Sequence, residues 1–413
     1  MNIGYKNHNN QQQLFIENVS LNDIIKKIGT PFYCYSKKAL IENFLQFEKA
    51  FNVYNVKNYK ICYAIKANHN INLVKILANL GSGIDAVSAG EIHHALKSNV
   101  NPKKIVFAGV GKTRAEIEYA LQNNIEEFAV ESIPEMHLLN EVAIKINKKA
   151  KFMLRVNPDI DAKTHDKIST GRKSDKFGVD INLATDIYHQ ASKCKGLEVY
   201  GISTHIGSQI TKIEPFTQAF IKIRELCLKL KKEGYKISNL DFGGGIGIKY
   251  RDEQIFTIND YVKKINDLTH DLGVEITIAP GRSVVGNTGL LISNITYIKE
   301  TSSKKFAIID AGMNDLARPG LYDAYHEVLP LIKKDNIEEI YDFAGPVCET
   351  TDILAKERKL PKLIAGENIA FLDCGAYGSS MSNQYNCRPL VPEILVDDKN
   401  FEIIRKRPTF DEM

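Results

Sequence analysis

Short apolar segments recur along the first two-thirds of the chain, and most gaps between them have the pattern of amphipathic helices, as in "NLVKILANLG" and "FIKIRELCLKLKKEG". Eight segments rich in β-branched and aromatic residues read as strands: "YKICYAI" (59–65), "GIDAVS" (83–88), "KIVFAG" (104–109), "EEFAVE" (126–131), "KFMLRVN" (151–157), "GISTHIG" (201–207), "NLDFGGG" (239–245) and "EITIAPG" (275–281). Strands that alternate with helices pair in parallel. Eight such units over roughly 220 residues match a (β/α)8 TIM barrel, and an open doubly wound sheet is the alternative.

The pattern changes after residue 285, where turns rather than helices separate the strands. These strand segments are "GLLISNITYIKET", "KKFAIIDAG", "IYDFAG", "NIAFLDCGAY" and "PEILVDDKNFEIIRKR". We therefore predict an α/β protein with a barrel over residues 36–285 and a C-terminal all-β domain over 286–413. The N-terminal segment, residues 1–35, is expected to pack with the β domain.

The N-terminal segment carries its own element signals. Ser20 and Asp23 resemble a capping box that opens a short helix ending at Gly29. A strand is predicted over 31–35, and Ser36 is expected to cap an amphipathic helix that runs to about Phe51.

Composition narrows the class of protein. Lysine and arginine number 54 against 50 acidic residues, and no dense basic run occurs, so a nucleic-acid partner is not expected. The seven cysteines form no CxxC pair, which favours a reducing compartment over a disulfide framework. The sequence has no apolar run near membrane-span length and no signal-peptide pattern, so we expect a cytoplasmic protein without a membrane partner.

Candidate chemistry gathers at the predicted strand ends, because catalytic groups of a barrel project from the carboxyl ends of its strands. The first strand ends on Lys66, the second carries Asp85, and the sixth carries His205. The glycine run Gly243, Gly244 and Gly245 follows the seventh strand, and Pro280, Gly281 and Arg282 follow the eighth. Glycines let backbone N–H groups approach an anion closely, so these two loops predict a phosphate site.

A lysine opposite a phosphate site suggests pyridoxal 5′-phosphate (PLP), because a lysine amine forms Schiff bases with carbonyl cofactors. A solvated rim lysine is the plainer interpretation of Lys66, and a packed barrel histidine is that of His205. No metal site is predicted: His93 and His94 are adjacent in sequence, and no HxxxH or HExxH motif occurs.

The motifs "YAIKAN", "GSGIDAVSAGE", "HIGSQ", "DFGGGIGI" and "APGR" resemble, in this order, the barrel motifs of fold-type III PLP-dependent decarboxylases, which share their fold with alanine racemase. "NDLARPGLYDAYH", "GPVCETTD" and "DCGAYGSSMSNQYN" narrow the resemblance to the diaminopimelate decarboxylase family, from about residue 20 to 410. This resemblance implies PLP-dependent decarboxylation of an amino diacid, meso-2,6-diaminopimelate, to L-lysine and CO2, the final step of lysine biosynthesis.

The resemblance also implies residue roles. Lys66 would bind PLP covalently, His205 would stack on its ring, and residues 243–245 and 280–282 would hold its phosphate. The substrate's distal carboxylate would meet Arg282, Arg318 and Tyr322, and its distal amine would meet Glu349. Cys348 would protonate the carbanion, and Tyr377 would contact cofactor and substrate. Cys348 and Glu349 would come from the neighbouring subunit, which implies a homodimer with shared active sites.

One position departs from the family pattern. Ala279 stands where the resembling enzymes have a glutamate that pairs with the pyridine nitrogen of PLP. Asp85 and Glu91 are possible substitutes for this glutamate.

Two alternative functions stay open: a decarboxylase of a related basic amino acid or polyamine precursor, and a non-catalytic PLP-binding homologue. An alanine racemase is disfavoured, because a racemase needs no recognition set for a distant carboxylate.

Overall fold

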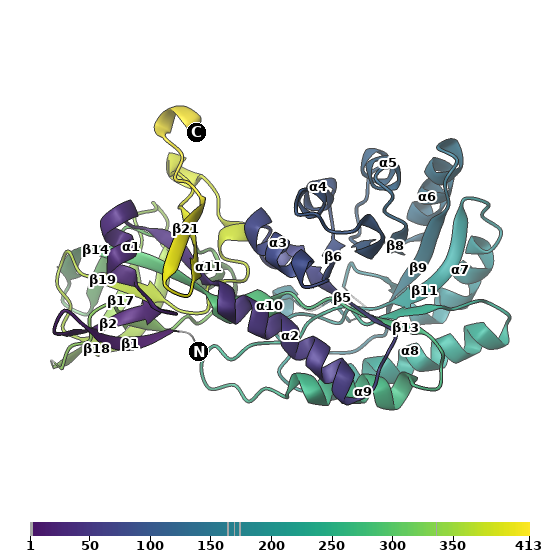
Figure 1. The fold of residues 1–413 in the computed structure, drawn as a ribbon, viewed down its shortest axis with the longest axis horizontal. Coiled ribbons are helices and arrows are strands. Elements are labelled where there is room, and N and C mark those ends of the chain that lie inside the picture. Colours follow the sequence, from purple (N-terminus) through teal and green to yellow (C-terminus); the bar gives the residue numbers. More distant parts are fainter. Residues whose placement is uncertain (1–2, 163–164, 169, 173–174, 336) are drawn as a thin grey trace. The chain divides into compact units, whose positions relative to one another are not determined.

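The computed structural model describes residues 3–162, 165–168, 170–172, 175–335 and 337–413 (Figure 1). The chain divides into two compact units. We call residues 44–248 with 254–283 the barrel unit, and residues 1–43, 249–253 and 284–413 the β unit. Among the described residues, no helix has both the length and the apolar character needed to cross a membrane.

Eight parallel strands close into a ring in the barrel unit. They are β5 (Tyr59–Ala64), β6 (Gly83–Ala86), β7 (Ile105–Phe107), β8 (Glu127–Val130), β9 (Ala150–Asn157), β11 (Leu197–Ser203), β12 (Asn239–Asp241) and β13 (Glu275–Ile278). Closure comes from two pairings, β13 with β5 and β8 with β9. The short strand β10 (Val179–Asp180) pairs with β9 beside this ring. The predicted TIM barrel is therefore confirmed, and the open doubly wound sheet is excluded.

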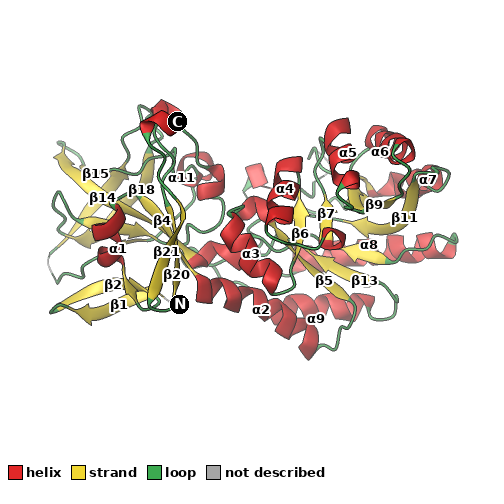
Figure 2. Cartoon of the chain, turned by 45° about the horizontal axis from the view of Figure 1, so that its top comes forward, coloured by secondary structure: helices red, strands yellow, loops and turns green. Residues whose placement is uncertain are grey.

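Helices follow most strands of the barrel unit and surround them (Figure 2). They are α3 (Ile71–Asn79), α4 (Ala89–Lys97), α5 (Arg114–Gln122), α6 (Ile133–Lys145), α7 (Ala184–Ala191), α8 (Glu214–Lys232) and α9 (Ile258–Thr269). Each of α4, α5 and α6 begins after a Ser or Thr whose hydroxyl accepts from the backbone N–H of the third helical residue. On α8 the buried residues recur every three or four positions, which presents one apolar face to the strands.

The β unit contains a seven-strand path in the order β18-β17-β15-β14-β4-β20-β21; off this path, β19 pairs with β14, and β16 pairs with β19. Its elements are β4 (Phe32–Ser36), β14 (Gly289–Glu300), β15 (Lys305–Ile309), β16 (Val328–Pro330), β17 (Glu338–Ala344), β18 (Ile353–Pro361), β19 (Asn368–Phe371), β20 (Glu393–Asp397), β21 (Asn400–Arg405) and the short helix α11 (Arg318–Tyr322). Strand β4 lies between β14 and β20, and all five of its residues are buried. Helix α2 (Lys37–Val53) follows β4 directly.

The N-terminal residues form more structure than their polar sequence predicted. Strands β1 (Ile3–His8), β2 (Gln11–Ile16) and β3 (Val19–Ser20) make a three-stranded sheet before α1 (Leu21–Ile28). The predicted capping box at Ser20 is wrong, because its hydroxyl donates to the Gln13 side-chain oxygen at 2.8 Å instead of capping the helix. The Ser36 cap is confirmed, since its Oγ accepts from the Ala39 N–H at 3.0 Å.

Candidate active site

Lys66 lies in a single 3-10 turn, Ile65–Ala67, directly after β5. Two contacts fix this turn: the Tyr63 hydroxyl donates to the Asn68 carbonyl at 3.0 Å, and the Ala64 N–H donates to the Pro280 carbonyl at 3.1 Å. The second contact joins the turn to the loop after β13. Lys66 and the "PGR" loop, predicted to meet at one end of the barrel, are therefore neighbours in space.

The glycine run after β12 is folded tightly against that same loop. Gly243 and Gly245 have φ of +62° and +111°, a backbone conformation that residues other than glycine rarely adopt. A Cβ on Gly244 would stand 2.0 Å from the Ala279 carbonyl oxygen. One on Gly281 would stand 3.1 Å from the Cβ of Ala64. Glycine at these positions lets the loops after β5, β12 and β13 converge.

Two hydroxyls and one guanidinium lie at this convergence. Arg282 Nη2 donates to Ser208 Oγ at 3.0 Å, which brings the loop after β11 to the same place. Ser283 Oγ is buried and has no hydrogen-bond partner among the described residues. Buried hydroxyls are normally hydrogen-bonded, so the exception is compatible with an absent oxyanion ligand. Glycine backbone, guanidinium and hydroxyl donors together fit the phosphate of PLP.

Sequence reasoning missed both serines as site residues. Ser208 stands inside "HIGSQ" and Ser283 directly follows "APGR", so both motifs carried a signal that the prediction did not use.

His205 follows β11 and is held by the glycine run. The Gly244 N–H donates to His205 Nδ1 at 3.2 Å, and a Cβ on Gly243 would come within 2.9 Å of the same atom. Burial, reinforced by the positive charges of Lys66 and Arg155, holds the pKa of His205 well below its usual value. The ring is therefore neutral, and because Nδ1 accepts a hydrogen bond, the ring proton is on Nε2.

Asp85 and Asp241 are two buried carboxyls close enough to interact electrostatically. Burial raises the pKa of Asp85, while Lys66 and Arg155 oppose the rise. Burial and the negative charge of Asp85 raise the pKa of Asp241 to about 6, although Ser203 Oγ and the Gly243 N–H both donate to its carboxylate at 2.8 Å.

The carboxylate of Glu91 accepts from the Val87 N–H at 2.7 Å, just before α4. Burial raises its pKa to about 7. Both carboxyls lie close enough to Lys66 to interact with its charge, and that of Glu91 also accepts a hydrogen bond at the start of its own helix.

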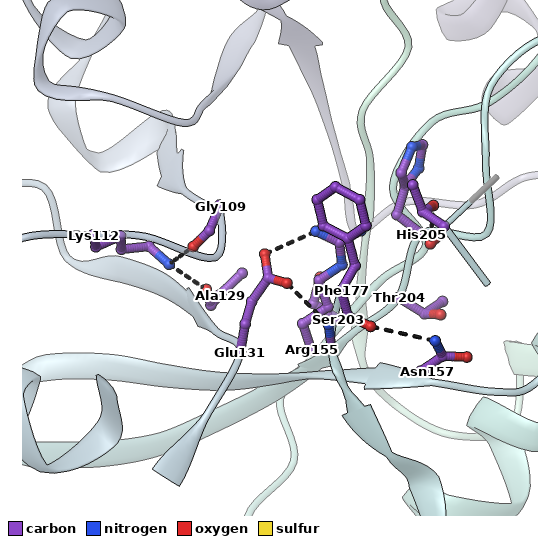
Figure 3. Close-up of polar contacts among 12 residues, drawn as sticks. Gly109, Lys112, Ala129, Glu131, Arg155, Asn157, Phe177, Ser203, Thr204 and His205 are labelled. Carbon is purple, nitrogen blue, oxygen red and sulfur yellow. Dashed lines mark hydrogen bonds and ion pairs between the residues drawn. The ribbon is translucent and has the colours of Figure 1, made fainter. Parts of the chain in front are cut away.

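A buried network of charges surrounds Arg155, as Figure 3 shows. Glu131 accepts from Arg155 Nη1 at 2.8 Å and from the Gly178 N–H at 2.9 Å, and the guanidinium lies 4.9 Å from the Phe177 ring centroid. Beside it, Lys112 Nζ donates to the carbonyls of Gly109 and Ala129, both at 2.7 Å. Lys112 Nζ also pairs with the Glu135 carboxylate at 2.6 Å, and Arg155 is the member of this network whose positive charge lowers the pKa of His205.

The remaining predicted residues, Arg318, Tyr322, Cys348, Glu349 and Tyr377, belong to the β unit. Arg318 is buried, and its Nη1 donates to His326 Nε2 at 2.8 Å. Cys348 and Glu349 are exposed and are tied to one segment: the Cys348 N–H donates to Asn386 Oδ1 at 3.1 Å, and the Tyr385 hydroxyl donates to Glu349 at 2.7 Å.

Tyr377 has a φ of +56°, an uncommon backbone conformation for a non-glycine residue. Contact of Tyr377 with cofactor and substrate stays a prediction.

Comparison with known proteins agrees with this geometry. A family model described as "Pyridoxal-dependent decarboxylase, pyridoxal binding domain" matches residues 37–286. Diaminopimelate decarboxylase of Aquifex aeolicus is 45% identical, with 97% of this chain and 94% of the relative covered. The chain belongs to the diaminopimelate decarboxylase family.

Further relatives extend this assignment. The Vibrio cholerae diaminopimelate decarboxylase is 44% identical over 98% of this chain and 96% of its own. A crystal structure of the Helicobacter pylori enzyme complexed with L-lysine superposes with a TM-score of 0.90 at 40% identity, covering 94% of this chain and 97% of that one. The family resemblance predicted from the sequence motifs is therefore confirmed.

Proposed function

We propose that the protein is a PLP-dependent carboxy-lyase that converts meso-2,6-diaminopimelate to L-lysine and CO2. The observation that carries the proposal is the junction of the Lys66 turn with the loop after β13, in a chain similar over nearly its whole length to diaminopimelate decarboxylases. In this role the protein completes lysine biosynthesis. A reducing cytoplasm suits its seven unpaired cysteines.

The barrel unit supplies the cofactor site. Lys66 Nζ would hold PLP covalently, and the 243–245 run, Gly281, Arg282, Ser208 and Ser283 would hold its phosphate. His205 offers an uncharged ring face, since protonation is suppressed. When bound, PLP withdraws electron density from the substrate Cα as CO2 leaves. The carboxyl of Asp85 stabilises the nearby positive charge of Lys66, and Ala279 contributes only a small, nonpolar side chain to the wall of the site.

The β unit supplies substrate recognition. Arg318 and Tyr322, together with Arg282, bind the distal carboxylate, because guanidinium groups match carboxylates bidentately. Glu349 binds the distal amine, and Tyr377 contacts cofactor and substrate. The Cys348 thiol donates a proton to the Cα that has lost CO2, and a second subunit of a homodimer delivers Cys348 and Glu349 to each site.

Recognition of a carboxylate and an amine at the far end selects an amino diacid. A site built to hydrogen-bond a group rejects analogues that lack it by large factors, because its own polar groups would be left unpaired. L-ornithine and L-lysine, which lack the second carboxylate, are therefore expected to be poor substrates.

The decisive experiment measures CO2 release from meso-diaminopimelate by the purified holoenzyme. Wild type should release CO2 and show a visible absorption band from covalently bound PLP, and Lys66→Ala should lose both. Lys75→Ala, an exposed lysine on α3, is the matched control and should keep both. Bound PLP without CO2 release from any amino diacid would overturn the proposal and leave the two alternatives, a decarboxylase of a related basic amino acid or polyamine precursor and a non-catalytic PLP-binding homologue.

Shared active sites are tested by mixing two inactive variants, Lys66→Ala and Cys348→Ala. Random exchange of subunits makes half of the dimers mixed, and each mixed dimer has one intact site. Mixing should therefore restore about a quarter of wild-type activity if the sites are shared between subunits. A mixture that stays inactive after verified subunit exchange would show that each chain supplies its own Cys348.

A further inference from the structure

Arg318 is buried beside two rings, those of His326 and Tyr250. Its Nη1 donates to His326 Nε2 at 2.8 Å, and its guanidinium carbon lies 4.6 Å from the Tyr250 ring centroid. Tyr250 and His326 contact each other edge to face, with centroids 5.6 Å apart and planes at 81°. All three residues are almost fully buried and belong to the β unit.

The contacts of His326 allow one protonation state. A guanidinium has only N–H donors, so His326 Nε2 must present its lone pair to Arg318. On the other side of the ring, Nδ1 lies 2.7 Å from the Leu372 carbonyl oxygen, which can only accept. The proton is therefore on Nδ1, and the imidazole is neutral. Protonating Nε2 would set an N–H against an N–H and a positive charge against a positive charge.

A neutral partner has a consequence for binding. A carboxylate at the position of His326 would hold Arg318 equally well but would cancel much of its charge. The imidazole accepts a hydrogen bond from the guanidinium and adds no negative charge of its own. Asp373 is the carboxyl that responds to this charge: burial raises its pKa to about 7, and Arg318 opposes the rise.

We propose that His326 is a positioning residue that holds Arg318, through its neutral imidazole, for the carboxylate which substrate and product share. This inference rests on the proposed function, because it concerns how the same site recognises an amino diacid. His326 touches no substrate atom. Discrimination at the distal carboxylate therefore depends on His326 and Arg318 together rather than on Arg318 alone.

The test compares two ligands on the holoenzyme by calorimetry. L-Lysine keeps the carboxylate, and 1,5-diaminopentane is the same molecule without it. His326→Phe removes the acceptor. His326→Gln places an amide oxygen at nearly the reach of Nε2, whereas His326→Asn, shorter by one methylene, does not reach Arg318.

We expect His326→Phe and His326→Asn to weaken L-lysine binding on the order of tenfold and to change diaminopentane binding less than twofold. His326→Gln should stay within threefold of wild type for both ligands. Unchanged L-lysine binding in the Phe and Asn variants, or equal loss of both ligands, would overturn the proposal. His326→Asn preserves the test if His326→Phe does not fold, and melting temperatures of all variants separate positioning from a loss of stability.

The two proposals fail separately. If wild type released no CO2 from meso-diaminopimelate, the proposed function would fail, while the ligand comparison would still report on His326. If CO2 release occurs and the ligand ratio does not move, only the role of His326 is wrong.

Discussion

The Gly244 N–H donates to His205 Nδ1 across 3.2 Å. Because this contact needs a ring nitrogen without a proton, it ties the tautomer of His205 to the path of the glycine run. We predict that 15N NMR will show His205 neutral at pH 6, with its proton on Nε2, although an unperturbed histidine would be mostly protonated there. A protonated ring at pH 6 would contradict this.

The same residue should affect stability against acid. Because the pKa of His205 is lowered in the folded chain, its ring binds a proton below about pH 6.5 only when the chain is unfolded. The free energy of unfolding therefore falls as pH falls. His205→Asn keeps an acceptor for Gly244 and removes the titration. Urea unfolding at pH 5 and pH 7 should show a smaller loss in this variant, by at most about 1.4 kcal/mol per pH unit. Equal losses would refute the linkage.

Gly244→Ala should damage the fold of the cofactor site. The added methyl would stand 2.0 Å from the Ala279 carbonyl oxygen, and backbone rather than a flexible side chain would have to move. We expect a loss of about 3 kcal/mol in the free energy of unfolding, with weaker binding of PLP. Gly111→Ala is the control: nothing lies within 4 Å of its added Cβ, and its stability should change by less than about 0.5 kcal/mol. Similar losses in both would rule out the close approach as the cause.

Glu131→Gln should be costly because it leaves the buried Arg155 guanidinium without its carboxylate. The two side chains are 2% and 9% exposed. Breaking such a pair costs about 3–5 kcal/mol. Glu141 pairs with Arg114 through two contacts of 2.9 and 2.8 Å, but both side chains are largely exposed. Glu141→Gln should therefore cost far less, because solvent screens an exposed pair. Chemical denaturation measures both, and equal costs would show that burial does not decide the difference.

Ala279→Glu tests the departure from the family pattern. Ala279 is 6% exposed, so a glutamate there would be buried and would need a cationic partner. If the pyridine nitrogen provides it, the variant should shift the absorption band of bound PLP and raise turnover about tenfold. Ala279→Gln matches the size without the charge and should do neither. No change with glutamate would show that the missing carboxylate does not limit this enzyme.

The barrel was predictable because each of its strands carries a short apolar run, and each run ends where polar residues begin. β5 and β13 were both found in this way. That they are neighbours was not visible in either segment, because it follows from closure of the ring. Strand β2 was missed because its first residues, Gln11 and Gln12, are polar and exposed, and only its last four residues are buried.

Site residues followed the same rule. Lys66, His205 and the glycine run stand at strand ends, where position along the chain implies position in space. His326 was not singled out: it stands eight residues after Arg318 in "NDLARPGLYDAYH", but the motif does not show that the two side chains touch, and Tyr250 and Leu372 come from distant segments. Only the folded chain shows that an otherwise ordinary histidine faces an arginine.

The placement of β4 determines the order in which the protein can fold during synthesis. β4 is made before the barrel, yet its neighbours β14 and β20 emerge from the ribosome about 250 and 350 residues later. The barrel unit can complete itself during that interval, while β4 remains an unpaired apolar strand. Closing so long a loop adds little to the equilibrium cost, because each doubling of length costs only about 0.6 kcal/mol. The risk comes from how long β4 stays unpaired and not from the free energy of closing the loop. A nascent chain that stalls before β20 presents the edge of β4 to other chains, and aggregation would begin there.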